Sequence, residues 1–183
     1  MTHASPALHT CWTCSLSKRS AADNGAVRAS APAPDTLVLA LGNPLRGDDG
    51  VGAAVIARLA EAHLPQGVDL RDGGTPGLET VLLLQGYRRV IIVDAAEMGQ
   101  APGAWVRFGP EEVRLQAADM HLRGTLHYAG LAEALALGGA LEVLPPEIVI
   151  YGVQPTEIGW TVGLSAPVAE AVAAVCTAIL KDL

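Results

Sequence analysis

The sequence is poor in cysteine, aromatic residues and positive charge, and each shortage argues against a class of function. Three cysteines among 183 residues are too few for the disulfide framework of a small secreted protein. Aromatic residues make up 4% of the chain, so platforms for stacking nucleic-acid bases are not expected. The 12 Lys and Arg against 19 Asp and Glu give a net charge of −7, which argues against nucleic acids and anionic membranes as partners. These features favour a cytoplasmic protein.

Long hydrophobic runs are also lacking. The longest apolar stretch, from Pro167 to Leu180, is interrupted by Glu170 and is shorter than the ~20 residues that cross a bilayer. The N-terminal region has no apolar segment following a basic one, so no secretory signal is expected there. We therefore predict neither a transmembrane segment nor a membrane partner.

Residues 1–35 differ in composition from the rest of the chain. They are rich in Ala, Ser, Thr and Pro and show neither helical nor strand periodicity, which predicts a disordered N-terminal extension. Cys11 and Cys14 have the spacing of half a zinc site, with His3 and His9 nearby, but no second pair at a suitable spacing completes it. Residues 36–183 are predicted to form a single α/β domain.

From Thr36 onward, short apolar runs alternate with segments of helical periodicity. The predicted strands are 36–41, 68–71, 89–93, 103–108 and 147–153, and the predicted helices are 51–63, 78–85, 126–137 and 167–180. Strands that are apolar throughout are typical of a sheet covered on both faces. The pattern predicts a three-layer αβα sandwich around a mostly parallel, twisted sheet of about five strands.

Acidic residues follow the first three predicted strands. Asp48 and Asp49 lie in the glycine-rich turn after the first strand, Asp72 ends the second, and Asp94 ends the third. Because ligands of open α/β sheets bind beyond the carboxyl ends of the strands, these carboxylates are expected to gather at one edge and attract a cation. Simpler roles remain open: one of the adjacent acids can cap the helix from Val51, and strand-end acids can brace turns.

The glycine-rich turn does not match a phosphate-binding loop, and other hydrolase motifs are also missing. The turn is neither GxGxxG nor GxxxxGK[ST], and its two acids stand where a phosphate would need bare N–H groups. The chain contains neither G-x-S-x-G nor H-E-x-x-H. Cys176 lies among apolar residues of the last predicted helix, which favours a core residue over a nucleophile.

Among the five histidines, His127 is the best candidate for a ligand. It lies just inside a predicted helix, where the helix dipole disfavours the imidazolium and keeps the ring able to coordinate metal. Together with two strand-end carboxylates it would form an O,O,N site with open coordination positions. This donor set suits zinc or nickel better than copper(I).

Five motifs, in this order and spacing, resemble those of the hydrogenase maturation proteases. These endopeptidases remove the C-terminal extension from the precursor of the nickel–iron hydrogenase large subunit. The resemblance covers about Thr36 to Leu180. The matching stretches are Leu41-Gly-Asn-Pro-Leu-Arg-Gly-Asp-Asp-Gly-Val-Gly52, Asp72-Gly-Gly-Thr-Pro-Gly77, Val90-Ile-Ile-Val-Asp-Ala95, His127-Tyr-Ala-Gly-Leu131 and Tyr151-Gly-Val-Gln-Pro155.

The resemblance implies a ligand set and a partner. The metal-binding residues of the family fall on Asp49, Asp94 and His127. The nickel they recognise is carried by the substrate, the large-subunit precursor, and zinc or cadmium is expected to occupy the site in the isolated protein. The resemblance thus predicts a processing endopeptidase whose open three-ligand site recognises whether the precursor carries nickel.

The resemblance also implies roles for the second motif. Asp72, Gly73 and Gly74 correspond to residues implicated in engaging the substrate. For the chemical step, the alternatives are a metal that polarises the scissile carbonyl or activates a water, and a carboxylate, Asp49 or Asp72, that acts as general base.

Two other classes of function predict the same carboxylates and histidine. One is a non-catalytic metallochaperone or metal-sensing partner that binds the immature large subunit without cutting it. The other is a metal-dependent hydrolase that acts on small substrates on the same fold, because a fold does not define a reaction. Cleavage of a peptide bond by purified components separates the first of these from a protease.

Overall fold

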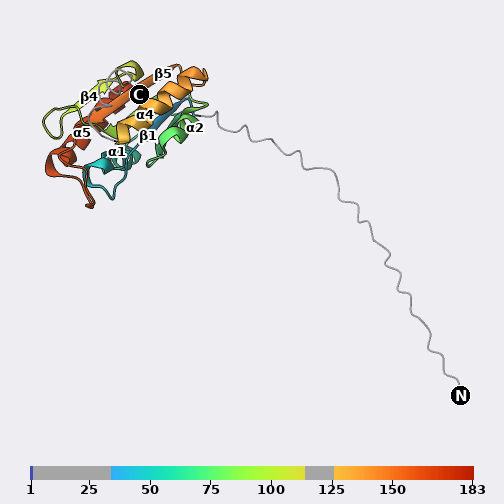
Figure 1. Ribbon diagram of the computed structural model, residues 1–183, viewed down its shortest axis with the longest axis horizontal. Coiled ribbons are helices and arrows are strands. Elements are labelled where there is room, and N and C mark those ends of the chain that lie inside the picture. Colours follow the sequence, from blue (N-terminus) through green and yellow to red (C-terminus); the bar gives the residue numbers. More distant parts are fainter. Residues whose placement is uncertain (2–33, 114–125) are drawn as a thin grey trace. The chain divides into compact units, whose positions relative to one another are not determined.

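The computed structural model describes Met1, residues 34–113 and residues 126–183, with the side chains of 126–129 left out. The chain divides into two units, Met1–Ala31 and Pro32–Leu183, and the description below concerns the second by itself. The predicted disordered extension falls almost entirely outside the described residues, as do Cys11 and Cys14, so the predictions made for them stay predictions. Figure 1 shows the order of the helices and strands of the second unit along the chain.

A five-stranded sheet forms the centre of the fold, with strand order β2-β1-β3-β5-β4. Its strands are β1 (Thr36–Ala40), β2 (Val68–Asp72), β3 (Arg89–Ala95), β4 (Trp105–Phe108) and β5 (Glu147–Val153). The first four in the order are parallel, whereas β4 runs antiparallel to β5 at the edge. The predicted number of strands and the mostly parallel sheet are confirmed.

Helices cover both faces of this sheet. They are α1 (Val51–Ala60), α2 (Thr80–Leu84), α4 (Leu126–Ala140) and α5 (Ala166–Asp182). One buried cluster joins Val38 of β1 to α1 and α5, and a second joins Leu37 and Leu39 to α2 and α4. Because neighbouring residues of a strand point to opposite faces, an uninterrupted apolar run fills both clusters. The predicted three-layer sandwich is therefore confirmed.

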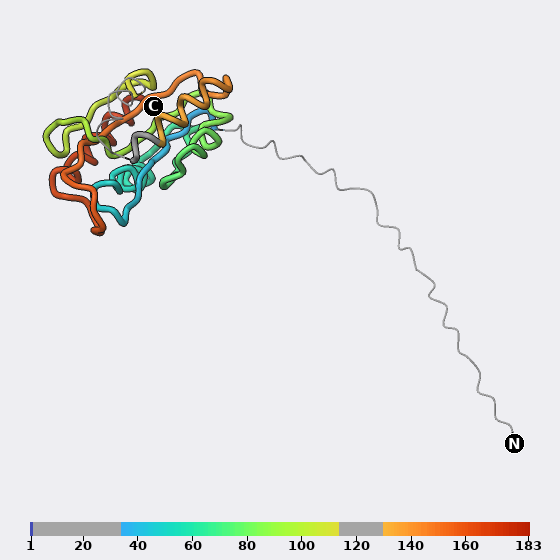
Figure 2. The backbone as a smooth tube through the Cα atoms, viewed as in Figure 1, coloured from blue at the N-terminus to red at the C-terminus, as the bar shows by residue number. Residues whose placement is uncertain are grey.

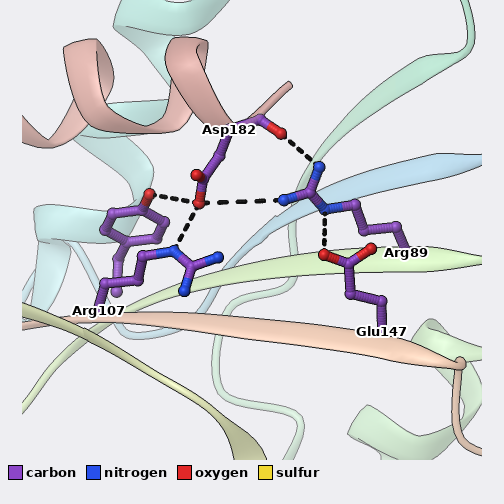
Figure 3. A network of polar contacts seen from close by, with 5 residues as sticks. Arg89, Arg107, Glu147 and Asp182 are labelled. Carbon is purple, nitrogen blue, oxygen red and sulfur yellow. Dashed lines mark hydrogen bonds and ion pairs between the residues drawn. The ribbon is translucent and has the colours of Figure 1, made fainter.

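The end of α5 is fastened to the sheet by Asp182 (Figure 3). Its Oδ2 accepts hydrogen bonds from Arg107 Nε at 2.7 Å and from the Tyr151 hydroxyl at 2.8 Å. Arg89 donates to the main-chain carbonyl of Asp182 and forms an ion pair with Glu147 at 3.1 Å. Burial raises the pKa of Asp182, but the hydrogen bonds from Arg107 and Tyr151 outweigh it, so the net pKa is lowered.

Replacing Asp182 with asparagine is expected to lower the free energy of unfolding by about 1–2 kcal/mol at pH 7, because hydrogen bonds to a charged acceptor are lost. A lowered folded-state pKa stabilises the fold only where the carboxylate is ionised. The difference from wild type should therefore shrink as the pH falls below 3.8, the ordinary pKa of the group. Urea unfolding at several pH values measures this. Glu147→Gln, at a side chain 54% exposed, should cost less, and an equal cost would contradict the assignment.

Candidate functional site

The three acidic positions predicted from the strand ends lie toward one edge of the sheet. Ala40, the last residue of β1, pairs with Asp72 of β2 on one side and with Val93 of β3 on the other. Asp94 therefore follows directly after the last residue that pairs with β1. Asp49 lies in the 3₁₀ helix Gly47–Gly50, which connects β1 to α1. Parallel pairing thus brings segments that are distant in the sequence to the carboxyl edge of the sheet.

Asp49 is held inside a tight loop. Its side chain is fully buried, and its Oδ2 accepts a hydrogen bond from the main-chain N–H of Asn43 at 2.8 Å. Gly42 starts this loop with φ +111°, and a Cβ added there would lie 2.0 Å from the carbonyl oxygen of Asp49. The loop can close around Asp49 only because glycine has no side chain and tolerates positive φ.

Gly42→Ala is expected to lower the free energy of unfolding by roughly 3 kcal/mol, because it combines backbone strain with a clash against main-chain atoms. Gly99→Ala is the matched control: Gly99 also has a positive φ, of +69°, but no atom lies within 4 Å of its added Cβ. The control should cost about 1 kcal/mol, the cost of strain alone. Chemical denaturation of both variants measures the difference, and similar losses would argue against the clash.

Asp94 faces the same interior from β3. Its side chain is 5% exposed, and among the described residues its Oδ1 has no hydrogen-bond partner. Burial raises the pKa of Asp94 to about 7, with a further upward contribution from the negative charge of Asp49, while the N–H of Ala95 acts in the opposite direction. Two buried carboxylates that repel each other, one with an oxygen left over, form a site that a hard or borderline cation would stabilise.

A pocket of about 180 Å³ lies beside Asp94. It is lined by Gly42, by residues 74–77 of the Asp-Gly-Gly loop, by Thr80 and by Gly130 and Leu131 of α4. Gly130 is closely packed, because a Cβ there would lie 3.3 Å from the Cα of Gly77. The pocket is therefore bordered by the loop after β1, the loop after β2 and the first turns of α4.

His127 lies in the first turn of α4, and its side chain is outside the described residues. Among the side chains that are described, no three of the His, Cys, Asp and Glu type are placed to hold a metal ion. Of the predicted ligands, the structure describes the side chains of Asp49 and Asp94 but only the backbone of His127. As a ligand set the three residues stay a prediction.

Asp72 braces its own turn. It is exposed, and its Oδ1 accepts a hydrogen bond from the N–H of Gly74 at 3.0 Å. Gly73 donates to the carbonyl of Ala40, and Gly74 accepts from the N–H of Gly42, both at 2.9 Å. The simpler role considered for Asp72, bracing the loop, is therefore present in the structure. Through these bonds the Asp-Gly-Gly turn is joined to the loop that carries Asp49.

The expectation that Asp48 or Asp49 caps the helix from Val51 is wrong. The residue at the N-cap of α1 is Gly50, and no side chain makes a capping hydrogen bond there. Asp48, 2% exposed, instead binds the loop after β5. Its Oδ1 accepts from the N–H of Ser165 at 2.6 Å, and its Oδ2 accepts from the N–H of Thr156 and the Ser165 hydroxyl, both at 2.8 Å.

These hydrogen bonds determine the charge of Asp48. Burial raises its pKa, but hydrogen bonds from the backbone and hydroxyl of Ser165 and the backbone of Thr156 outweigh this effect and lower the pKa overall. The adjacent acids therefore differ: Asp48 is a buried clamp between two loops, whereas Asp49 lies near enough to Asp94 for its negative charge to raise the pKa of Asp94. Figure 2 shows the two clamped segments, cyan after β1 and orange-red after β5, next to each other.

Gln154 is a site-supporting residue that the sequence patterns did not single out by itself. It is 5% exposed, and its Oε1 accepts from the N–H groups of Met98 at 2.7 Å and Gln100 at 3.2 Å. Its Nε2 donates to Glu97 at 2.9 Å. The side chain thus orders the loop that follows Asp94. The signal available in the sequence was its place in the fifth motif, between β5 and Pro155.

The described helices are all too short or too polar to span a bilayer. The fold and the buried acids define an α/β protein with a pocket lined by Asp94 at the carboxyl edge of its sheet. A family model described as hydrogenase maturation protease matches residues 53–182. The chain belongs to the hydrogenase maturation protease family.

Individual relatives agree with this assignment. The chain is 38% identical over 128 residues to the hydrogenase expression/formation protein HoxM of Azotobacter vinelandii, covering 69% of this chain and 60% of that protein. It spans 58–60% of the length of the first curated relatives that it matches.

Solved structures show the same fold. The hydrogenase maturating endopeptidase HybD of Escherichia coli aligns with a TM-score of 0.72 at 29% identity, covering 81% of this chain and 91% of that one. A hydrogenase 2 maturation peptidase from a Thaumarchaeota archaeon aligns with a TM-score of 0.61 at 35% identity, covering 80% of this chain and 96% of that one.

Proposed function

We propose that this protein is an endopeptidase that removes the C-terminal extension of a nickel-loaded nickel–iron hydrogenase large-subunit precursor. The observation that carries the proposal is a pair of buried, electrostatically interacting carboxylates, Asp49 and Asp94, of which Asp94 lines a pocket and has one oxygen without a partner among the described residues. Membership of the family supports the reaction class. The cysteine usage of the chain favours the cytoplasm as its compartment.

In this proposal the nickel is part of the substrate. Asp49, Asp94 and His127 complete the coordination shell of the nickel when the precursor docks. A precursor without nickel lacks the positive charge that would relieve the repulsion between Asp49 and Asp94. Helical spacing supports the third ligand: position 127 precedes Gly130 by three residues and Leu131 by four, so it shares the helix face whose later residues line the pocket. The site thereby distinguishes loaded from unloaded precursor.

The extension is proposed to lie along the pocket beside the Asp-Gly-Gly loop. Gly74 lines the pocket, and Gly73 and Asp72 hold the turn in place by hydrogen bonds. A scissile carbonyl placed here is attacked by water, the attacking water gives up a proton, and the leaving amine takes one up. The candidates for accepting the proton are Asp49, next to the nickel, and Asp72, which is open to solvent. The nickel can also polarise the carbonyl or activate the water.

The direct test mixes the purified protein with the large-subunit precursor of the same organism, prepared with and without nickel. Release of the C-terminal extension is followed by mass spectrometry. We expect release from the nickel-loaded precursor and none from the unloaded form. If the nickel-loaded precursor is bound but stays uncut, the protein is a metal-sensing partner and the protease proposal is wrong.

A further inference from the structure

An exposed apolar group stands on the two loops that Asp48 clamps together. It consists of Leu45, which is 57% exposed, and of Trp160 and Val162, each 82% exposed, and we call these three residues the apolar tip. Leu45 belongs to the loop after β1, and the other two belong to the loop after β5. An isolated exposed leucine is ordinary, but a tryptophan and a valine left almost entirely in water on one short loop are not.

The loops that carry the apolar tip are held in place. Gly47 donates a hydrogen bond to the carbonyl of Thr161 at 2.6 Å, between Trp160 and Val162. The guanidinium of Arg46 lies 5.7 Å from the centre of the Trp160 ring, within the range of a cation–π contact. Asp48 holds both ends of the loop through Thr156 and Ser165, as described above. The side chains are thus presented outward on an ordered support, which reduces the entropy lost on binding.

The apolar tip and the proposed active site share the loop after β1, which carries Leu45 of the tip and Gly42 of the pocket lining. The 3₁₀ helix Gly47–Gly50 follows directly after Leu45 and Arg46, and carries the buried Asp49. The loops after β1 and β5 both leave the carboxyl edge of the sheet, the edge on which Asp94 lies. When the C-terminal extension of a substrate protein occupies the pocket, the folded part of that substrate therefore lies next to this edge of the sheet.

We infer that the apolar tip docks the folded body of the precursor whose extension enters the pocket. This inference rests on the proposed function, because it assumes that the substrate is a protein. A second copy of this chain is the less suitable occupant: three side chains supply at most roughly 500 Å², below the ~800 Å² per partner of a stable dimer. A substrate already held through its extension and its nickel needs only such an additional contact.

Trp160 is the largest of the three side chains and among the most exposed, so it is the residue to change first. Trp160→Ala and Val162→Ser are measured in the full chain with nickel-loaded precursor, first for the dissociation constant and then for extension release. We expect Trp160→Ala to raise the dissociation constant about tenfold or more, the size of effect found for tryptophan at the centre of an interface. The rate of release from the bound complex should stay within about twofold, because neither residue is part of the carboxylate site.

Leu141→Ser is the matched control. Leu141 is 58% exposed, and it follows α4 on the segment leading to Glu147, where β5 begins at the opposite edge of the sheet. Its replacement should leave the dissociation constant unchanged. Equal affinities for wild type and Trp160→Ala, or equal losses for Trp160→Ala and Leu141→Ser, would overturn the docking inference.

The remaining outcomes separate this inference from the proposed function. If wild type binds the nickel-loaded precursor without cutting it and Trp160→Ala weakens binding, the docking surface is supported and the protease proposal is overturned. If wild type cuts the precursor and Trp160→Ala binds as tightly, only the docking inference is overturned. If sedimentation shows a dimer that Trp160→Ala dissociates while precursor affinity is unchanged, the tip is a self-association surface and the inference is wrong.

Discussion

Asp94→Asn is expected to reduce release of the extension from nickel-loaded precursor by on the order of 10²- to 10³-fold, as when one electrostatic partner of a reacting centre is removed. Asparagine keeps the shape of the side chain but provides no negative charge for the nickel. Because Asp94 is buried and repelled by Asp49, removing its charge should leave the fold intact and relieve a repulsion at neutral pH. The measurement is single-turnover extension release, with unfolding measured on the same preparation.

The control for this variant is Asp69→Asn. Asp69 is also an aspartate of the sheet, but it lies near the beginning of β2, where its Oδ2 accepts a hydrogen bond from the Tyr87 hydroxyl at 2.6 Å. It is remote from the carboxyl edge, so its variant should process the precursor at close to the wild-type rate. Full activity of Asp94→Asn would eliminate Asp94 as a nickel-recognising residue, and equal losses for both variants would point to a general effect on the sheet.

The elements of the fold that could be predicted are those with a physical signature within a few residues. Residues 37–40 of β1 and 90–93 of β3 are uninterrupted apolar runs, which are typical of strands buried on both faces. The orientation of β4 had no such signature: its burial does not alternate along the strand, and only its pairing with β5 shows that it is antiparallel. The predicted helix 78–85 is in fact a 3₁₀ helix, Gly77–Glu79, followed by the five-residue α2. Short helices depend on packing more than on local periodicity.

The candidate site could be predicted where the ends of parallel strands determine which residues meet. It could not be predicted where the position of a side chain depends on hydrogen bonds to residues far away in the sequence. The carboxyl ends of parallel strands lie at the same edge of a sheet. Asp72 and Asp94 could therefore be placed at that edge once the strands were expected to be parallel. Asp48 and Asp49 are neighbours with the same chemistry, and their different roles follow from partners elsewhere. The partners of Asp48 are Thr156 and Ser165, 108 and 117 residues away. No local pattern identifies such contacts.

The stability of the metal-free protein is expected to fall as the pH rises from about 4 to about 7, and Asp94 is the reason. Its folded-state pKa is raised from 3.8 to about 7, chiefly by burial and then by the charge of Asp49. Between these two values the folded protein holds a proton that the unfolded chain has released. Stability therefore decreases with rising pH in this window and levels off above it. A shift of about 3 pKa units corresponds to roughly 4 kcal/mol.

Urea unfolding of metal-free protein between pH 4 and pH 8.5 measures this loss, and Asp94→Asn is the control. The variant cannot ionise at position 94, so its curve should lack the decrease and lie above that of wild type at pH 8. The lowered pKa values of Asp48 and Asp182 affect stability below about pH 4, outside the window. If a divalent cation binds between the two acids, as proposed, adding it should restore stability at pH 8 in wild type only, because it replaces the proton as the charge between them. Parallel curves for wild type and variant would show that Asp94 is not the group that titrates, and would remove the electrostatic basis of a site that senses the metal of its substrate.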